Sequence, residues 1–427
     1  MTAASRQTQD PIAWSAVWAV FFLALLWTRL GIPTRIMFDE THYVPAARMM
    51  LDLKTNNPEH PLLGKEIIAA AIALLGDKPL YWRLPSAILG AFGLFAFARA
   101  LWWASLRPFA THAGMFLVAT GFVWFVQSRI AMLDMPMACA TMVALWMLAA
   151  AVRRPEGARW RLAVAGLCLG LAMASKWSVA PLLVLPGLTF LALKLKDNGA
   201  RFLFARPGGP FPGITLAEAG LWLGLLPLAV YWASFAPAFF YTDRPVNWLD
   251  PIGHHQWMLQ LQGSVTKPHP YQSHWYEWMG NWRPIWFLYQ PVDGAQRGIL
   301  LLGNPFSMLA GLAGAAWCLW AALWRKRRDA LAVFVLYAVS IGFWALSNKP
   351  IQFYYHYLLP GTFLMACLAL ALDAAWEGGR RWLRWGTGLV LAVSAGMFVH
   401  FYPILSAAKL CCGKPSFAYW MWLDSWR

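Results

Sequence analysis

Two adjacent carboxylates lie in this chain shortly after a long apolar run, where buried charge is costly unless it is paired or used. They are Asp39 and Glu40, within Phe38–Tyr43, FDETHY. A carboxylate held beside an alcohol can take the hydroxyl proton as a new bond forms. Both are therefore candidate catalytic residues. The alternative is that they are acidic first-turn residues of a helix.

A second polar cluster surrounds a Pro and a Gly in the segment 59–66, EHPLLGKE. Its His60 and Lys65 are candidate substrate-binding residues, because a His and a Lys beside two Glu could bind phosphate or a metal. The alternative is the start of a helix at the membrane interface.

Two further clusters lie between apolar runs. Arg129 and Asp134, in SRIAMLDMP, are candidate substrate-binding residues or an internal ion pair that joins two helices. Lys176, beside Trp177, is typical of an anchor whose charge reaches the membrane surface.

The last cluster places a cation before aromatic hydroxyls and a histidine, in NKPIQFYYHYLLP. Lys349, Tyr354, Tyr355 and His356 could all donate hydrogen bonds to a phosphate, so they are candidate substrate-binding residues. The alternative is an aromatic belt at a membrane interface.

The composition is that of a membrane protein. Of the 427 residues, 59% are hydrophobic and 13% are charged, and there are 28 Trp. About a quarter charged is usual in soluble proteins. The net charge of +16 fits basic cytoplasmic loops rather than nucleic-acid binding. The six Cys form no metal-binding pattern; Cys139, Cys168, Cys318 and Cys367 lie in apolar runs and are expected in the core.

Apolar runs of near-spanning length predict an all-α polytopic protein with about 11 transmembrane helices, forming one membrane domain over 1–427. The first run lacks a cleavage site and is expected to be retained. The expected spans are 12–31, 83–103, 112–126, 137–152, 162–175, 179–195, 216–235, 299–324, 330–347, 353–373 and 385–402.

The short loops fix the expected orientation, because Lys and Arg concentrate on the cytoplasmic side. Alternate loops are rich in Arg and Lys, as in Arg325–Arg328, whereas the others hold one basic residue each. The N-terminus is then inside and the C-terminus outside. Two long loops, 32–82 and 236–298, face outward with most of the acidic residues, and 66–76 is expected to form a helix too short to span.

Taken in order, several motifs resemble the protein O-mannosyltransferases, glycosyltransferase family 39, which have the GT-C fold. The resemblance runs from about residue 15 to the end. The matching pieces are FDETHY, HPLLGK where the family has His-Pro-Pro-Leu-Gly-Lys, WRLPSAILGAFG, SRIAMLDMPMA, GLAMASKW, HPYQSHWYEW, FYYHYLLP and MWLDSW.

The resemblance implies inverting transfer of mannose from polyprenyl-phosphate mannose to a Ser or Thr hydroxyl of an exported protein. It implies Asp39 as the base. It also implies a multi-pass protein of the bacterial inner membrane with its site on the periplasmic side. No cofactor or metal is expected to be obligatory, although a divalent metal stays open.

Two departures keep alternatives open. Leu62 replaces the second Pro of the family motif, and the loop 236–298 is too short for the large soluble domain of eukaryotic members, which indicates a bacterial type. Glu59 before His60 resembles the lipid A aminoarabinose transferases, so a lipid or glycan acceptor is the alternative. A lipid transporter or flippase is the alternative outside enzymes, although internal repeats typical of transporters are missing.

Overall fold

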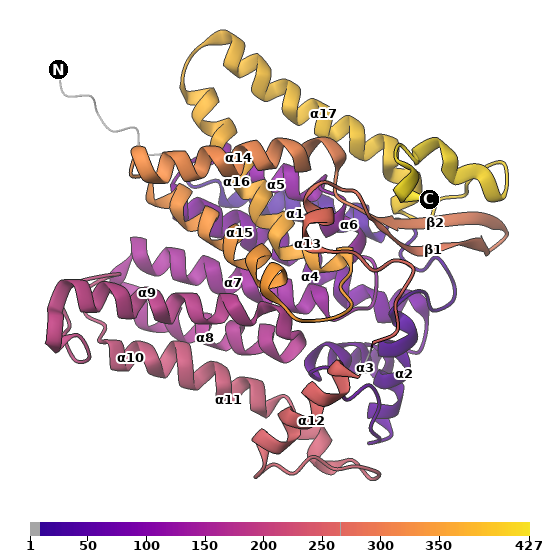
Figure 1. Ribbon diagram of the computed structural model, residues 1–427, viewed down its shortest axis with the longest axis horizontal. Helices are drawn as coiled ribbons and strands as arrows, with labels where there is room; N and C mark the ends of the chain where they lie inside the picture. Colours follow the sequence, from indigo (N-terminus) through magenta and orange to yellow (C-terminus); the bar gives the residue numbers. More distant parts are fainter. Residues whose placement is uncertain (1–8, 265) are drawn as a thin grey trace.

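The structure is a computed structural model that describes residues 9–264 and 266–427. It is a bundle of helices with one small sheet (Figure 1). The bundle helices are α1 (Ile12–Trp27), α4 (Pro79–Ser105), α5 (Pro108–Ala119), α7 (Asp134–Arg153), α8 (Ala158–Ser175), α9 (Ala180–Asn198), α10 (Leu216–Gly220), α11 (Leu226–Ala233), α14 (Pro305–Trp324), α15 (Arg328–Leu346), α16 (Leu358–Glu377) and α17 (Arg381–Leu405). The other elements are α2 (Glu40–Leu51), α3 (Leu63–Leu75), α6 (Val123–Gln127), α12 (Pro251–Gly263), α13 (Trp275–Met279), β1 (Ile285–Val292) and β2 (Ala295–Leu301).

The expected membrane spans are found in the structure. Within the described residues, nine helical stretches are long and apolar enough to cross a membrane, and two shorter apolar helices, α1 and α5, correspond to the remaining two expected spans. The expected span 112–126 is α5 followed by α6, because the chain breaks at 120–122, where Phe122 has a φ of 60°. Asn304 donates to the freed carbonyl of Thr120.

Both long outer loops gather at one end of the bundle, on the right in Figure 1, together with the C-terminal segment. Asp293, at the tip of the sheet, accepts hydrogen bonds from Thr34 in the first loop. Leu410 pairs with Gln296 of β2. The start of α1 lies at the other end of the bundle, where Asp10 pairs with Arg99 near the C-terminal end of α4. The two ends of the described chain thus lie at opposite ends of the bundle.

The sheet corrects one expected boundary. The chain is mostly helical, as expected, but it also contains an antiparallel hairpin, and the expected helix 299–324 begins only at Pro305, because 299–301 belong to β2. Asp293 and Gly294 both have positive φ, 51° and 73°. An Asp-Gly turn of this kind joins two strands with the twist that a hairpin needs. The apolar run GILLL therefore pairs as a strand.

The first outer loop is fixed to the bundle by a fully buried ion pair. Arg83, near the start of α4, donates to both carboxylate oxygens of Glu40 at 2.7 and 2.8 Å, and neither side chain is exposed. The same guanidinium donates to the carbonyls of Leu30, Pro33 and Arg35. Glu40 also accepts from the backbone nitrogens of Met37 and Ala131. One pair thus joins the end of α1, the start of α2 and the loop before α7.

We predict that Glu40→Gln strongly lowers the thermal stability of the purified protein. Removing one partner of a buried pair leaves an uncompensated charge and costs about 3–5 kcal/mol. The matched control is Asp77→Asn, which breaks the pair with Arg48, because both of those side chains are 41% exposed. An exposed pair contributes at most about 1 kcal/mol. Equal melting temperatures for the two variants would contradict an anchoring role for Glu40.

Candidate active site at the outer end of the bundle

Asp39 lies at the centre of the predicted site, as the residue that precedes the first turn of α2. Asp39 and Glu40 thus lie at the start of a helix, as the alternative interpretation of this pair predicted. The side chain of Asp39 is half-buried. Burial raises the pKa of its carboxyl to about 6, and the positive charges of Lys176 and His42 oppose this rise. Asp39 is thus mostly deprotonated at neutral pH, yet it is a stronger base than an exposed carboxylate.

A buried ion pair lies beside Asp39. Lys176 donates to both carboxylate oxygens of Asp134 at 2.8 Å, and both side chains are almost entirely buried. The lysine nitrogen also lies 4.6 Å from the ring centre of Tyr355. Asp134 begins α7 and Lys176 follows α8, so the pair joins the ends of two helices.

Lys176 was not among the predicted site residues. Its position beside Trp177 indicated a surface anchor, and this interpretation was wrong because the side chain is buried. The internal pair suggested for Asp134 was also assigned to the wrong partner. Arg129 instead donates to the carbonyl of Leu26 at 2.5 Å and lies over Phe125. No sequence signal pointed to the pair of Lys176 with Asp134, because the two residues are 42 positions apart and only the packing of α7 against α8 brings them together.

Lys349 is a second cation that faces Asp39. It is half-buried, and the described residues include no salt-bridge partner for its ammonium group. Burial lowers the pKa of Lys349 to about 8, helped by the charge of Lys176 and opposed by Asp39 and Asp134. Such a cation is available to an anionic ligand.

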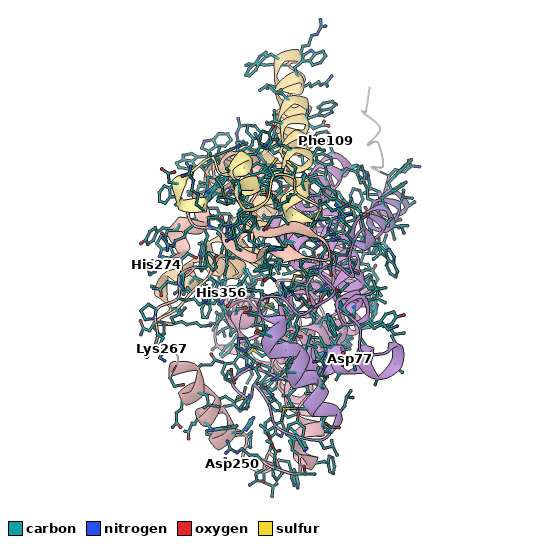
Figure 2. All side chains as sticks on the ribbon, turned by 90° about the vertical axis from the view of Figure 1, so that its right-hand side faces the viewer. Asp77, Phe109, Asp250, Lys267, His274 and His356 are labelled. Carbon is teal, nitrogen blue, oxygen red and sulfur yellow. The ribbon has the colours of Figure 1, made fainter. Side chains whose placement is uncertain are left out.

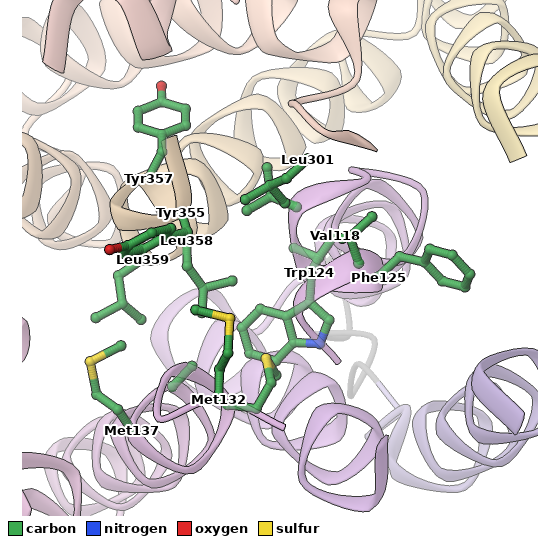
Figure 3. Close-up of a cluster of buried hydrophobic side chains, with 14 of the residues drawn as sticks. Val118, Trp124, Phe125, Met132, Met137, Leu301, Tyr355, Tyr357, Leu358 and Leu359 are labelled. Carbon is green, nitrogen blue, oxygen red and sulfur yellow. The ribbon is translucent and has the colours of Figure 1, made fainter. Parts of the chain in front are cut away.

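The aromatic segment before α16 completes this side of the site. Tyr355 lies edge-on to Phe38, with ring centres 6.0 Å apart. The ring of His356 packs on Trp344, and its Nδ1 accepts from the backbone nitrogen of Phe353. In Figure 2, which looks onto the loop end, His356 lies closer to the centre of the molecule than His274. Figure 3 shows part of the buried hydrophobic core, in which Leu359 of α16 faces Met137 of α7.

His60 also lies near the charged groups of the site. Its ring is 6.0 Å from that of Tyr43. Burial and the charges of Lys65, Lys176 and Lys349 lower the pKa of His60 well below its usual value, so the ring is neutral at pH 7. A neutral imidazole can donate one hydrogen bond and accept another.

Three of the predicted residues use their polar atoms to hold the protein together. Lys65 donates to the carbonyls of Asn57 and His60 at 2.7 and 2.9 Å. Arg129 binds the end of α1, as described above. Tyr354 donates to Asn281 and accepts from the backbone nitrogen of Gly303. These contacts position the walls of the site.

The described residues contain no group of three or more His, Cys, Asp or Glu side chains arranged to hold a metal ion. Four cysteines, Cys139, Cys168, Cys318 and Cys367, are buried in the core as expected, whereas Cys411 and Cys412 are exposed.

Comparison with known proteins gives a consistent family assignment. Residues 59–207 match the sequence profile described as dolichyl-phosphate-mannose-protein mannosyltransferase. Residues 247–426 match the C-terminal four-transmembrane region of protein O-mannosyltransferase. A polyprenol-phosphate-mannose–protein mannosyltransferase of Mycolicibacterium smegmatis is 27% identical over 93% of this chain and 89% of its own length.

Solved structures show the same fold. The Pmt1–Pmt2 protein O-mannosyltransferase complex of S. cerevisiae, bound to the sugar donor, has a chain that superposes with a TM-score of 0.81 at 14% identity, covering 98% of this chain and 93% of that one. ArnT from Cupriavidus metallidurans has a TM-score of 0.60 at 16% identity, covering 91% of this chain and 76% of that one. The two sequence profiles name the same family and together cover most of this chain, which therefore belongs to the protein O-mannosyltransferase family.

Proposed function

We propose that this protein transfers mannose from polyprenyl-phosphate mannose to Ser or Thr hydroxyls of exported proteins, with inversion at the sugar carbon. The observation that carries the proposal is Asp39, a carboxylate with a pKa of about 6 that faces the cations Lys176 and Lys349. The names of the curated relatives supply the sugar and the acceptor class. The site then faces the periplasm, from the inner membrane of a bacterium.

In this mechanism Asp39 is the general base. The acceptor oxygen attacks the sugar carbon from the face opposite the phosphate, while its proton passes to Asp39. The bond between that carbon and the phosphate oxygen breaks, and polyprenyl phosphate leaves. A base that is deprotonated at neutral pH, with a pKa near the working pH, suits this proton transfer.

The leaving phosphate gains negative charge as the bond breaks, so fixed cations stabilise the transition state. Lys349 is proposed to bind the phosphate directly, because its ammonium group is not committed to a carboxylate. Lys176 is already paired with Asp134, so its role is to hold positive charge in place beside Asp39. His60, Tyr355 and His356 are proposed to contact the sugar phosphate. Glu40, Lys65, Arg129 and Tyr354 are proposed to position these groups.

The polyprenyl chain needs an apolar path away from the site. An apolar hollow of about 420 Å³ lies between α9 and α15, and its lining includes Leu182, Leu336 and Phe363. Helix α15 runs from this hollow to the segment that carries Lys349. We propose that the hollow receives part of the lipid chain, with the phosphate at the outer end of the same helix.

The function is tested by mass spectrometry of exported proteins from cells with and without the gene. We expect hexose on specific Ser or Thr residues only when the gene is present. Complementation with the wild-type gene, but not with the Asp39→Asn variant, should restore it. Unchanged proteins together with loss of a sugar from a membrane lipid would contradict the protein acceptor and favour the lipid alternative.

We predict that Asp39→Asn lowers the transfer rate of the purified protein by a factor of about 10² to 10⁴, the usual contribution of a general base. The amide keeps the shape of the side chain, so folding and binding of the donor should persist. The matched control is Asp52→Asn at the exposed far end of α2, which should transfer at the normal rate. Normal turnover of Asp39→Asn, with loss in a folded Glu40→Gln protein, would move the base to Glu40.

We also predict a bell-shaped dependence of the rate on pH. The rate should rise as pH increases through about 6, where Asp39 loses its proton, and fall above about 8, where Lys349 loses its charge. Lys349→Arg provides the control, because arginine stays protonated at these pH values. The variant should lose the alkaline fall and keep the acidic one. An alkaline fall unchanged in this variant would show that another group causes it.

A further inference from the structure

The two exposed cysteines, Cys411 and Cys412, are neighbours in the sequence and in space. Their Sγ atoms are 3.0 Å apart, and the thiol of Cys412 donates to that of Cys411. A disulfide has an S–S distance of about 2.0 Å, so forming the bond brings the two sulfur atoms closer by about 1 Å and closes an eight-membered ring that includes the peptide bond between the two residues. The other four cysteines are buried, so they do not compete for this chemistry.

The backbone around the pair is held from both sides while the thiols stay exposed. On one side Leu410 donates to the carbonyl of Gln296 in β2 at 2.9 Å. On the other side the hydroxyl of Tyr289 in β1 donates to the carbonyl of Lys414 at 2.5 Å. Figure 1 shows this segment beside the hairpin, between α17 and the C-terminus. Cys412 has a φ of 69°, a left-handed conformation that few residues other than glycine adopt.

We propose that Cys411 and Cys412 are a redox modification site, at which the two thiols are oxidised to a disulfide between adjacent residues by a protein disulfide of the outer compartment. The location follows from the proposed orientation, because Leu410 and Lys414, on either side of the pair, contact the hairpin of the second long loop. Compartments outside the bacterial cytoplasm favour disulfides. The site is separate from Asp39 and takes no part in mannosyl transfer.

The exchange proceeds in two steps that balance. The thiolate of Cys411 attacks one sulfur of the oxidant disulfide, which forms a mixed disulfide and releases one thiolate. The thiol of Cys412 then loses its proton and attacks Cys411 Sγ, which closes the ring and releases the second thiolate. The protein loses two electrons and two protons, and the oxidant becomes two thiols. Cys411 attacks first because the hydrogen bond that Cys412 donates raises the pKa of the Cys412 thiol.

Closing the ring would fix the turn that holds the C-terminal segment on the hairpin. The tip of the same hairpin contacts the first outer loop, where Asp293 accepts from the backbone nitrogen of Thr34 at 2.9 Å. The disulfide would therefore stabilise a contact that reaches the segment just before Asp39. We expect slower amide hydrogen exchange at Leu410 in the oxidised protein than in the reduced one. Equal exchange in the two states would overturn this bracing effect.

The test uses the purified full-length protein and oxidised glutathione as the oxidant. After incubation, free thiols are alkylated under denaturing conditions and the peptides are analysed by mass spectrometry. We expect the peptide that contains both cysteines to carry no alkyl group. Its mass should be that of the unmodified dithiol peptide minus two hydrogen atoms. The four core cysteines should be alkylated.

Single variants separate ring closure from simple oxidation. In Cys411→Ser and Cys412→Ser the remaining thiol has no neighbour to displace glutathione, so a glutathione adduct should persist. In the wild-type protein the adduct should be transient. A lasting adduct on the wild-type protein, two alkylated thiols after oxidation, or a bond between two chains would each overturn the proposal. None of these readouts depends on transferase activity, so the proposed function is tested separately.

Discussion

The buried pair between Glu40 and Arg83 is the interaction on which the geometry of the site depends. The guanidinium group of Arg83 donates five hydrogen bonds, which join the segment 30–35 and the start of α2 to α4. Asp39 is the neighbour of Glu40, so the anchor fixes the backbone position of the proposed base. A buried pair contributes little net stability when its desolvation is counted. Its value here is that it specifies one position for a loop that carries reactive groups.

These contacts give the two adjacent carboxylates, Asp39 and Glu40, different environments. Both oxygens of Glu40 are occupied by Arg83 and by two backbone nitrogens, so its charge is neutralised and its lone pairs are used. Asp39 has no such partner for its side chain among the hydrogen bonds of the described residues and keeps part of its surface exposed. Burial without full compensation raises its pKa. Two neighbouring residues of the same chemistry thus have different environments, which is a common route to separate roles.

The two lysines of the site, Lys176 and Lys349, also have different environments. Lys176 is neutralised by Asp134 and fixed by two hydrogen bonds, whereas Lys349 has no carboxylate partner among the described residues. The ammonium group of Lys176 is therefore held in place, whereas that of Lys349 is available to an anionic ligand. Both lie at helix ends on the face where the hairpin and the C-terminal segment pack. This face is therefore where the proposed phosphate site and the two long loops lie together.

The sequence alone predicted which segments are long and apolar enough to cross a membrane, and the described residues form apolar helices at those positions. Hydropathy and charge along a single chain are enough for this, because every spanning helix satisfies its own backbone and must be apolar. It also made Asp39, Lys349 and His60 candidates for the site, because charged side chains beside apolar runs are conspicuous. Tertiary structure alone decided the partners: Asp134 pairs with Lys176 rather than with Arg129, and Glu40 pairs with Arg83, 43 residues away. It also decided that 299–301 form a strand, because an apolar run of that length suits either a helix or a paired strand. Hydropathy is a property of each segment, whereas an ion pair or a strand pairing depends on which other segment the packing brings within reach.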